Sequence, residues 1–453
     1  MVWRDYRRLT IFRTALWIGF IVIMTFLLIT NSSLLIGAVT GDTANRFEQS
    51  ASIPNQERDT LAEERNGTTV FSSHLGEGQL TAINRQGRLQ YYNDTYDGYW
   101  DIDPISGEKD IILYSATKVV DCQFQNCLRQ VIETVNLTSG DTHRLYTRLY
   151  RNSEGNQWHD VDRIGPRTLL VADMAESRVF KLNTSTEKII WQWDAQSIYS
   201  TTNGGDFPRD WTHLNDVEEV RNGTIMVSIR NFDEVVFIRP NGTLAKDWTL
   251  GESGSHDILY EQHNPDYIPK SRGGPAVVVA DSENNRIVEY QRTANGSWSR
   301  SWSWRDAQLS WARDADRLPS GNTLISDSHG GRVFEVAPND SIVWSLSVPS
   351  VYESERLSTR DESGGGPSAN SADLRSQTTS LNESLSIRQR IGDGLKSVFP
   401  AKIVHGVNTV TPDRILFAET VVFALGILIG LALLIVELYA RDYGVRNPIS
   451  KDI

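Results

Sequence analysis

Four short phrases decide the fold of this chain: WHDVDRI from Trp158, THLNDVEEV from Thr212, QHNPDYI from Gln262 and WARDADRL from Trp311. In each phrase a His or Arg stands three residues before an Asp, and the successive His and Arg positions are 54, 50 and 50 residues apart. A period near 50 residues is typical of a repeat architecture in which each copy is one structural unit.

Each phrase is followed by short apolar runs rich in β-branched residues and separated by polar turns. After the first phrase these runs are TLLVAD, RVFKL and KIIWQWD, and the later copies have the same order. Such runs predict strands, and three or four strands per 50 residues is the content of one propeller blade. Weaker copies extend the series backwards through YWDIDPI, where Trp100 and Asp103 take the His and Asp positions, and through NGTTVFSSH from Asn66. The sequence therefore predicts an all-β fold, a six-bladed β-propeller over residues 62–350.

The repeated cationic residues predict a site on the propeller axis. The innermost strand of each blade lines the central channel, so side chains at equivalent repeat positions form a ring. His159, His213, His263 and Arg313 would then converge on one point. The alternative is structural, because a buried His can also bond to an Asp and clamp adjacent strands.

Two apolar segments, at 15–36 and 415–439, are long enough to cross a bilayer. Arg residues precede the first segment and Arg and Lys follow the second, so the positive-inside rule places both termini in the cytoplasm and the propeller outside. The first segment could also be a signal peptide cleaved within GAVTGDTA from Gly37. The predicted order is a cytoplasmic tail (1–14), a transmembrane helix (15–36), a linker (37–61), the propeller (62–350), a polar linker or loop (351–384), a membrane-proximal segment (385–412), a transmembrane helix (415–439) and a cytoplasmic tail (440–453).

Modification signals agree with an exterior location. Cys122 and Cys127 lie close together in DCQFQNC, and outside the cell they predict a local disulfide that closes a hairpin loop. Asn-X-Ser/Thr sequons predict glycosylation, although several of them are also Asn-Gly turns. The sequons that carry this prediction are at Asn66, Asn93, Asn136, Asn183, Asn222, Asn241, Asn295, Asn339 and Asn382.

The charge balance is acidic, with a formal net charge of −12. Such a surface repels nucleic acid, so we expect no nucleic-acid partner. An acidic chain whose basic residues are mostly Arg is also typical of a salt-loving archaeon.

The repeats resemble the arylsulfate sulfotransferases, most clearly over residues 155–350 in WTHLNDVEEVRNGTIMVSIRNFDEVVFI from Trp211 and HNPDYI from His263. The resemblance implies transfer of a sulfuryl group from a phenolic sulfate ester to a phenol, without a nucleotide sulfate donor. In that family a channel His is transiently sulfated, while other His and Arg side chains hold the sulfate. By this resemblance His213, in a His-X-Asn pattern, and His263 are the candidate catalytic residues. The candidate substrate-binding residues are His159, Arg286 and Arg313.

The chain departs from the family at Arg313, which stands where the sulfated His of the last blade is expected. Arg stays protonated below about pH 12, so it cannot act as a nucleophile. His329, 16 residues further on, is a substitute to consider. For Arg286 the alternative is a turn brace, because the same Asp-to-Arg spacing recurs at Asp173 and Arg178 and at Asp327 and Arg332.

Three functions stay open at this point. The first is a membrane-anchored sulfotransferase that uses His213 or His263. The second is a non-catalytic exterior propeller that binds anionic glycans, other anionic ligands or partner proteins. The third is a quinone-cofactor dehydrogenase, suggested by strands that close on Trp but opposed by the spacing of the two cysteines. We expect no cofactor, with calcium as the alternative where Asp residues crowd one repeat position, at Asp160, Asp162, Asp210, Asp216, Asp314 and Asp316.

Overall fold

The computed structural model describes residues 14, 16–21, 45–74, 78–122, 125–151, 157–306, 308–359, 361–377, 398 and 417–442. Most of the first predicted span, nearly all of the predicted membrane-proximal segment and the sequon at Asn382 lie outside the described residues. The chain divides into two compact units. One unit consists of residues 43–384, and the other combines residues 1–42 with residues 385–453.

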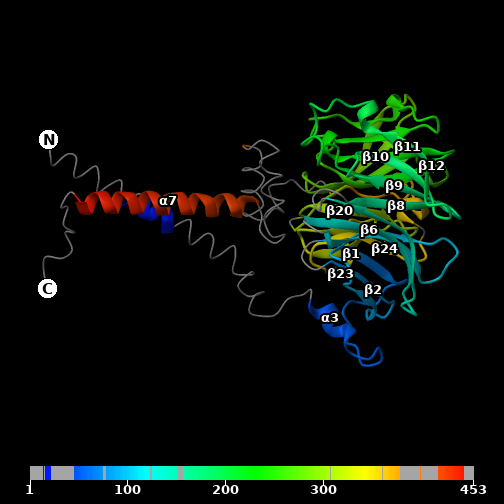
Figure 1. The fold of residues 1–453 in the computed structure, drawn as a ribbon, viewed down its shortest axis with the longest axis horizontal. Helices are drawn as coiled ribbons and strands as arrows, with labels where there is room; N and C mark the ends of the chain where they lie inside the picture. Colours follow the sequence, from blue (N-terminus) through cyan, green and yellow to red (C-terminus); the bar gives the residue numbers. More distant parts are fainter. Residues whose placement is uncertain are drawn as a thin grey trace. The chain divides into compact units, whose positions relative to one another are not determined.

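The larger unit is an all-β propeller of six antiparallel four-stranded sheets, as the repeats predict (Figure 1). Five blades are continuous in sequence, and their strands are named from the innermost outward. Blade 2 has β4 (Gly98–Pro104), β5 (Ile111–Cys122), β6 (Gln125–Asn136) and β7 (Thr142–Tyr150); blade 3 has β8 (Trp158–Gly165), β9 (Thr168–Asp173), β10 (Arg178–Asn183) and β11 (Lys188–Asp194); blade 4 has β12 (Leu214–Arg221), β13 (Thr224–Ile229), β14 (Glu234–Ile238) and β15 (Leu250–Gly251); blade 5 has β16 (His263–Ile268), β17 (Ala276–Asp281), β18 (Arg286–Arg292) and β19 (Trp298–Trp304); blade 6 has β20 (Ala312–Arg317), β21 (Thr323–Asp327), β22 (Arg332–Val336) and β23 (Ile342–Ser347).

Blade 1 joins the two ends of the propeller. Its innermost strand is β24 (Val351–Arg356), which pairs with β1 (Thr69–Ser73), and β2 (Gln79–Ile83) and β3 (Leu89–Asn93) complete the sheet. The innermost strands contact one another in a closed circle of β24, β4, β8, β12, β16 and β20. The closing strand β24 lies beyond the boundary at residue 350 that the repeats predict, within the segment predicted to be a polar linker or loop. Its sequence VYESER has no apolar run, although all six residues are buried.

The core lies between neighbouring blades. In β17 (AVVVAD) every residue is buried, and in β9 (TLLVAD) only Thr168 is partly exposed. Strands that pack on both faces are apolar along their whole length, so they lack the alternation of a half-exposed strand. One cluster, for example, packs Val227 of blade 4 against Leu170 of blade 3 around the buried Trp193 and Trp211.

The described residues that directly follow β24, 357–359 and 361–377, contact blades 5 and 6, and we call them the C-terminal strap. Its short η5 helix (Glu362–Gly365) contacts β16 and β20. At its far end, Nε1 of Trp302 donates a 3.0 Å hydrogen bond to the Arg375 carbonyl, and the Gln377 amide donates to the Ser303 carbonyl. The strap is therefore part of the propeller and not a free linker.

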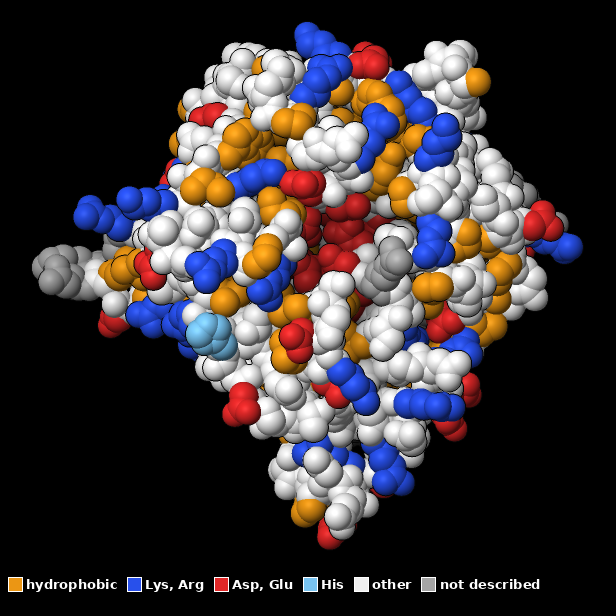
Figure 2. Space-filling view, turned by 90° about the vertical axis from the view of Figure 1, so that its right-hand side faces the viewer, with side chains coloured by type: hydrophobic (Ala, Val, Ile, Leu, Met, Phe, Trp, Pro, Cys, Tyr) orange, Lys and Arg blue, Asp and Glu red, His pale blue; other side chains and the backbone are white. Residues whose placement is uncertain are grey.

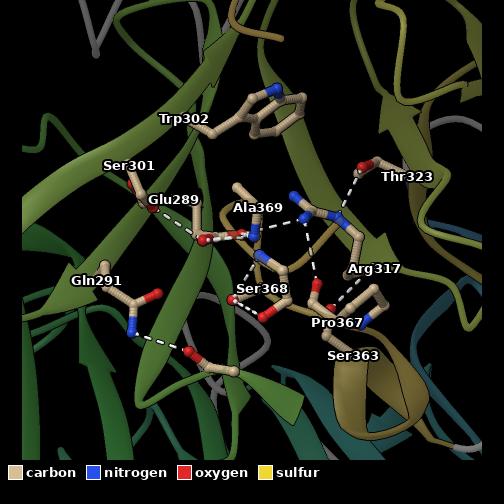
Figure 3. Close-up of polar contacts among 12 residues, drawn as sticks. Glu289, Gln291, Ser301, Trp302, Arg317, Thr323, Ser363, Pro367, Ser368 and Ala369 are labelled. Carbon is tan, nitrogen blue, oxygen red and sulfur yellow. Dashed lines mark hydrogen bonds and ion pairs between the residues drawn. The ribbon is translucent and has the colours of Figure 1, made fainter. Parts of the chain in front are cut away.

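A buried ion pair fixes the middle of the C-terminal strap (Figure 3). Nη1 of Arg317 lies 3.0 Å from Oε2 of Glu289, and both side chains are fully buried. The Arg317 amide donates to Oγ of Ser363, its Nη1 donates to the Pro367 carbonyl, and the Glu289 carboxylate accepts the Ala369 amide at 2.9 Å. Removing either charge would leave the other buried without compensation.

The α-helices α3 and α7 lie outside the sheets. The α3 helix (Asn45–Ala51) packs Phe47 on Phe71 of β1, with ring centroids 5.4 Å apart. The α7 helix (Phe417–Asp442) belongs to the smaller unit and covers the second segment predicted to cross the membrane. Within the part of the chain that the structure describes, no helix qualifies as a candidate membrane span.

Candidate active site in the central channel

Near the start of each innermost strand lies one side chain at the same position of the repeat. These six side chains form what we call the channel ring, and each is followed three residues later by an acidic residue. The ring consists of Trp100, His159, His213, His263, Arg313 and Tyr352, and the acidic residues are Asp103, Asp162, Asp216, Asp266, Asp316 and Glu355. Tyr352 and Glu355 supply the sixth copy, which was not predicted because neither residue matches the His or Asp of the other copies.

The ring side chains meet at one end of the channel. His159 stacks on Trp100 with ring centroids 4.5 Å apart, and its centroid lies 5.1 Å from that of His213. The His213 and His263 centroids are 6.3 Å apart. The guanidinium carbon of Arg313 lies 5.0 Å from the centroid of the Tyr352 ring. The structure thus brings together four of the five residues predicted for catalysis and substrate binding.

His213 has an acidic partner that orients its imidazole. Nδ1 of His213 lies 2.5 Å from Oδ1 of Asp210, and the His213 side chain is 14% exposed. This hydrogen bond fixes the tautomer with the proton on Nδ1, so Nε2 carries the lone pair. His213 also has a backbone φ of +46°, a region that residues other than glycine rarely adopt and that is concentrated at functional sites.

The residues around His213 hold this geometry. Asn215, the third residue of the His-X-Asn pattern, donates a 3.0 Å hydrogen bond to the Gln262 carbonyl and so ties β12 to the start of β16. The sequence pattern grouped Asp210 with the aspartates of a possible calcium site. The structure instead pairs it with His213, at the opposite end of the strands from the repeated Asp position.

His263 is engaged at both ring nitrogens. Its Nδ1 lies 2.8 Å from Oγ of Ser282, whose hydroxyl donates to the Ala312 carbonyl at 2.6 Å. Because that hydroxyl proton is used, Nδ1 of His263 is the donor to Ser282 and Nε2 carries the lone pair. Nη1 of Arg313 lies 3.4 Å from that Nε2. The lone pair of His263 therefore points at a cation, which makes His263 a poorer nucleophile than His213.

Tyr352 and His74 complete the site, and neither was predicted as a site residue. The Tyr352 hydroxyl lies 3.2 Å from Nδ1 of His159. The His74 ring lies 4.8 Å from Trp100 and 5.2 Å from Tyr352, measured between centroids. His74 ends the phrase NGTTVFSSH, so the signal for it was present in the sequence. His329 lies beside Trp311, with centroids 4.7 Å apart.

Burial favours the neutral form of three imidazoles near the ring, those of His74, His159 and His263. It lowers the pKa of His74, His159 and His263 well below the ordinary value, and the charge of Arg313 acts in the same direction on all three. A neutral imidazole can act as a nucleophile or accept a proton near pH 7, whereas an imidazolium cannot.

Arg230 is a second buried cation, which the sequence did not predict. It belongs to the η2 helix (Arg230–Phe232) directly after β13, and only 2% of its surface is exposed. Its Nη2 lies 2.6 Å from Oε2 of Glu261. Burial and the charge of Arg313 lower the pKa of His263 most, and the charge of Arg230 lowers it further. The sequences of the other blades have no equivalent Arg, so the repeats give no signal for it.

Arg286 does not belong to the channel ring. Its Nε lies 2.5 Å from Oδ2 of Asp281, and its Nη2 donates to the carbonyls of Asp257 and Ile258. The same brace joins Arg178 to Asp173 and Arg332 to Asp327, both at 2.9 Å. The structure thus shows the turn brace of the alternative, in which Arg286 fastens the turn between two strands, and it gives no support to the substrate-binding role predicted for Arg286.

The other half of the channel is acidic. Burial raises the pKa of Asp160 and Asp314 to about 7 and that of Glu218 to about 8, and it raises the pKa of most of the other carboxyls in this half. Figure 2 shows Asp and Glu side chains gathered in the hollow at the centre of one face. The buried or half-buried carboxyls of this half are Asp101, Asp103, Asp160, Asp162, Asp216, Glu218, Asp266, Asp314, Asp316, Glu353, Glu355, Asp361 and Glu362.

The predicted modification sites lie away from the ring. Cys122 and Cys127 form a disulfide across the turn between β5 and β6. Glycosylation stays a prediction, and the structure gives only the exposure of each Asn. Asn66, Asn222, Asn241, Asn295 and Asn339 are exposed, whereas Asn93, Asn136 and Asn183 are partly buried.

Comparison with known proteins identifies a family. The family model described as Arylsulfotransferase (ASST) matches residues 76–348. No curated protein gives a significant match. Similar solved structures include a protein of unknown function from Bacteroides caccae, which is 13% identical with a TM-score of 0.45 and covers 64% of this chain and 97% of its own. The periplasmic gluconolactonase of Pseudomonas aeruginosa is 13% identical with a TM-score of 0.43 and covers 67% and 89%, and virginiamycin B lyase from Staphylococcus aureus is 10% identical with a TM-score of 0.40 and covers 64% and 86%. Such distant similarity says nothing about the activity of this chain.

Proposed function

The chain belongs to the arylsulfotransferase family, and from this premise we propose that it transfers a sulfuryl group from a phenolic sulfate ester to a phenol acceptor at the channel ring. The observation that carries the proposal is the pairing of His213 with Asp210 inside a ring that also holds the buried imidazoles of His159 and His263 and the guanidinium of Arg313. A nucleophile oriented by an acidic partner is the recurring arrangement of covalent catalysis.

In the proposed first step, Nε2 of His213 attacks the sulfur of the donor. The new N–S bond forms as the bond between sulfur and the aryl oxygen breaks, and the phenolate leaves. The imidazole becomes positively charged, and the Asp210 carboxylate at Nδ1 stabilises that charge. In the second step the acceptor oxygen attacks sulfur and the N–S bond breaks. The acceptor releases its proton, which balances the proton that the departed phenolate takes up.

Arginine side chains would hold the sulfuryl oxygens. These oxygens carry negative charge through the transition state, and buried guanidinium groups stabilise such charge by charge-assisted hydrogen bonds. Arg313 lies within the ring, and Arg230 lies close enough to influence its imidazoles. His159, which Tyr352 contacts at Nδ1, is placed to bind the ester on the other side.

The position of Arg313 supports His213 as the nucleophile. Arg313 replaces the His that the family resemblance predicts as the sulfated residue, and its guanidinium lies at Nε2 of His263. His213 is the remaining catalytic candidate, and its imidazole is oriented by Asp210. In this proposal the nucleophile belongs to blade 4 and not to blade 6, and Arg313 supplies positive charge in the ring.

The location of the site is also part of the proposal. The hydropathy of segments 15–36 and 415–439 and the flanking Arg and Lys residues support a membrane-anchored chain with the propeller outside the cell. The disulfide between Cys122 and Cys127 supports an oxidising compartment. Protease added to intact cells should then degrade the propeller and spare both tails.

The test is sulfuryl transfer by the full-length chain purified in detergent. We expect nitrophenolate release from 4-nitrophenyl sulfate that depends on an added phenol. His213→Gln should lower the rate by about 10³-fold or more, because it removes the nucleophile. His143→Gln is the matched control, since His143 is an exposed residue of the outermost strand β7.

A second function is favoured by one observation: Arg313 stands where the family resemblance predicts the nucleophilic His. In that case the ring binds anionic ligands, such as sulfated glycans, without turning them over. A folded chain that binds 4-nitrophenyl sulfate at the ring but releases no nitrophenolate with any phenol would support this function and contradict transfer.

A further inference from the structure

Three carboxylates meet at the acidic end of the channel, outside the proposed active site. They belong to Asp103 on β4, Asp162 on β8 and Asp361 in the C-terminal strap. One oxygen from each lies within 4.8 Å of the other two. Asp103 and Asp162 are only 4% and 6% exposed. Residues from three separate parts of the sequence thus present oxygen atoms to one small volume.

Each of these carboxylates has an oxygen without a hydrogen-bond partner among the described residues. These atoms are Oδ2 of Asp103, Oδ1 of Asp162 and Oδ1 of Asp361, and all three are buried. A buried polar atom that is left unsatisfied is costly and points to a missing partner. The three residues also line a pocket of about 1000 Å³, together with Glu218 and Glu362. A small ion could therefore reach them.

Within the described part of the chain, the three carboxylates have no counterion in contact, although Lys109 and Arg163 line the same pocket. Among the described residues, no ion pair neutralises Asp103, Asp162 or Asp361, whereas Glu289 beneath the same strap is paired with Arg317. The strap is fastened to blade 5 and blade 6 by direct hydrogen bonds, including one from Ser363 to Asp266. At blades 2 and 3 Asp361 faces the carboxyl groups of Asp103 and Asp162, and a cation between them would relieve their mutual repulsion when they are ionised.

We propose that Asp103, Asp162 and Asp361 bind a divalent cation of the calcium type. Hard cations prefer carboxylate oxygens, and Ca²⁺ accepts six to eight oxygen ligands at about 2.3–2.6 Å, so two oxygens on one ion can be about 5 Å apart. Mg²⁺ has shorter bonds of about 2.0–2.1 Å and demands octahedral geometry, which makes it the poorer fit. Water in the pocket would supply the remaining ligands.

The cation would complete the attachment of the C-terminal strap. It would join Asp361 to the innermost strands of blades 2 and 3, opposite the Arg317–Glu289 pair that holds the strap to blades 5 and 6. Its role is structural, and it goes beyond the proposed sulfuryl transfer. The site lies at the far end of the innermost strands from the channel ring, so its test does not depend on activity.

The experiment is calorimetric titration of the full-length chain with CaCl₂ and with MgCl₂ after removal of metal by a chelator. We expect calcium binding that Asp103→Asn and Asp162→Asn each weaken by at least about tenfold, because affinity follows the number of charged ligands. Asp216→Asn is the matched control. Asp216 has the same repeat position, is 2% exposed and also has an unpartnered oxygen, but it is not one of the three.

A second measurement needs no variant and covers the case in which a variant fails to fold. Calcium should raise the Tm of the wild-type chain, because a ligand that binds only the folded state stabilises it. The proposal is overturned if about 10 mM calcium gives neither heat nor a rise in Tm, since that exceeds the range of weak exterior calcium sites. Tighter binding of magnesium than of calcium, or equal weakening by Asp216→Asn, would also overturn it.

Discussion

Nη1 of Arg313 lies 3.4 Å from Nε2 of His263, and the guanidinium carbon lies 5.0 Å from the centroid of the Tyr352 ring. An Arg cannot accept a sulfuryl group, but it can neutralise one. In the proposed transfer, these two residues would divide the work that the family resemblance assigns to histidines of the channel. Arg313 supplies fixed positive charge, and His263 is held neutral beside it by burial and by that charge.

Loss of the Arg313 cation should weaken transition-state binding. We expect Arg313→Gln to lower kcat/KM for 4-nitrophenyl sulfate by about 10²–10³-fold, the usual effect of removing one donor to a developing negative charge. Arg313→Lys should keep only part of the wild-type kcat/KM, because the point charge of an ammonium group does not reproduce the planar hydrogen-bonding fork of a guanidinium. Arg286→Gln in the turn brace is the control, and an equal loss there would contradict the proposed role of Arg313.

Removal of the Asp210 carboxylate should affect the chemical step more than binding. We expect Asp210→Asn to lower kcat by about 10²–10⁴-fold with little change in KM, because His213 loses the partner that sets its tautomer. Steady-state kinetics with varied donor concentration separate the two constants. Asp247→Asn removes a carboxylate that is 68% exposed and should leave both constants unchanged. A pure rise in KM for Asp210→Asn would speak against its role.

The acidic half of the channel should make stability depend on pH through Asp314. Burial raises its pKa from 3.8 to about 7, so between these values the folded chain binds more protons than the unfolded chain. The free energy of unfolding should then fall as pH rises through this window. Asp314→Asn keeps an acceptor for the Ser354 amide but cannot ionise, so its stability should fall less. Urea unfolding of both chains at about pH 5 and pH 8 with a chelator present tests this. The same loss of unfolding free energy between the two pH values in the wild-type chain and in Asp314→Asn would contradict the prediction.

The buried pair beneath the C-terminal strap should be sensitive to loss of one partner. We expect Arg317→Met to lower the free energy of unfolding by about 3–5 kcal/mol, because it leaves Glu289 buried and unpaired. The double variant Arg317→Met with Glu289→Gln should recover part of that loss, since it buries no charge. Urea unfolding of the three chains is the measurement. A single-variant cost below about 1 kcal/mol would show that the pair does not hold the strap.

The blades could be predicted from the sequence because each one repeats the same local pattern. Blade 1 is the exception, since β24 comes from the far end of the propeller and pairs with β1 only in the folded chain. Its ring residue, Tyr352, is neither cationic nor in an apolar run. The spacing from Tyr352 to Glu355 is nevertheless the spacing from His159 to Asp162. That spacing was the signal for Tyr352 that the sequence contained.

Other parts of the site depend on contacts that a repeat cannot reveal. Arg230 follows the second strand of blade 4, and the other blades have no Arg at that position. Only the folded structure shows that its charge lies near His263. Arg286 shows the opposite case, because its repeated spacing correctly indicated a brace. The pairing of Asp210 with His213 was not predicted, because the repeat places an Asp three residues after each His, and Asp210 lies three residues before it.

The most direct test of the central claim is the mass of the chain after incubation with 4-nitrophenyl sulfate in the absence of an acceptor. Peptide mass spectrometry at neutral to alkaline pH should find one added sulfuryl group on the peptide that contains His213. The group should disappear when a phenol is added, and it should not form in His213→Gln. A sulfuryl group on His263 or His159, or turnover that continues in His213→Gln, would contradict the assignment of His213 as the nucleophile.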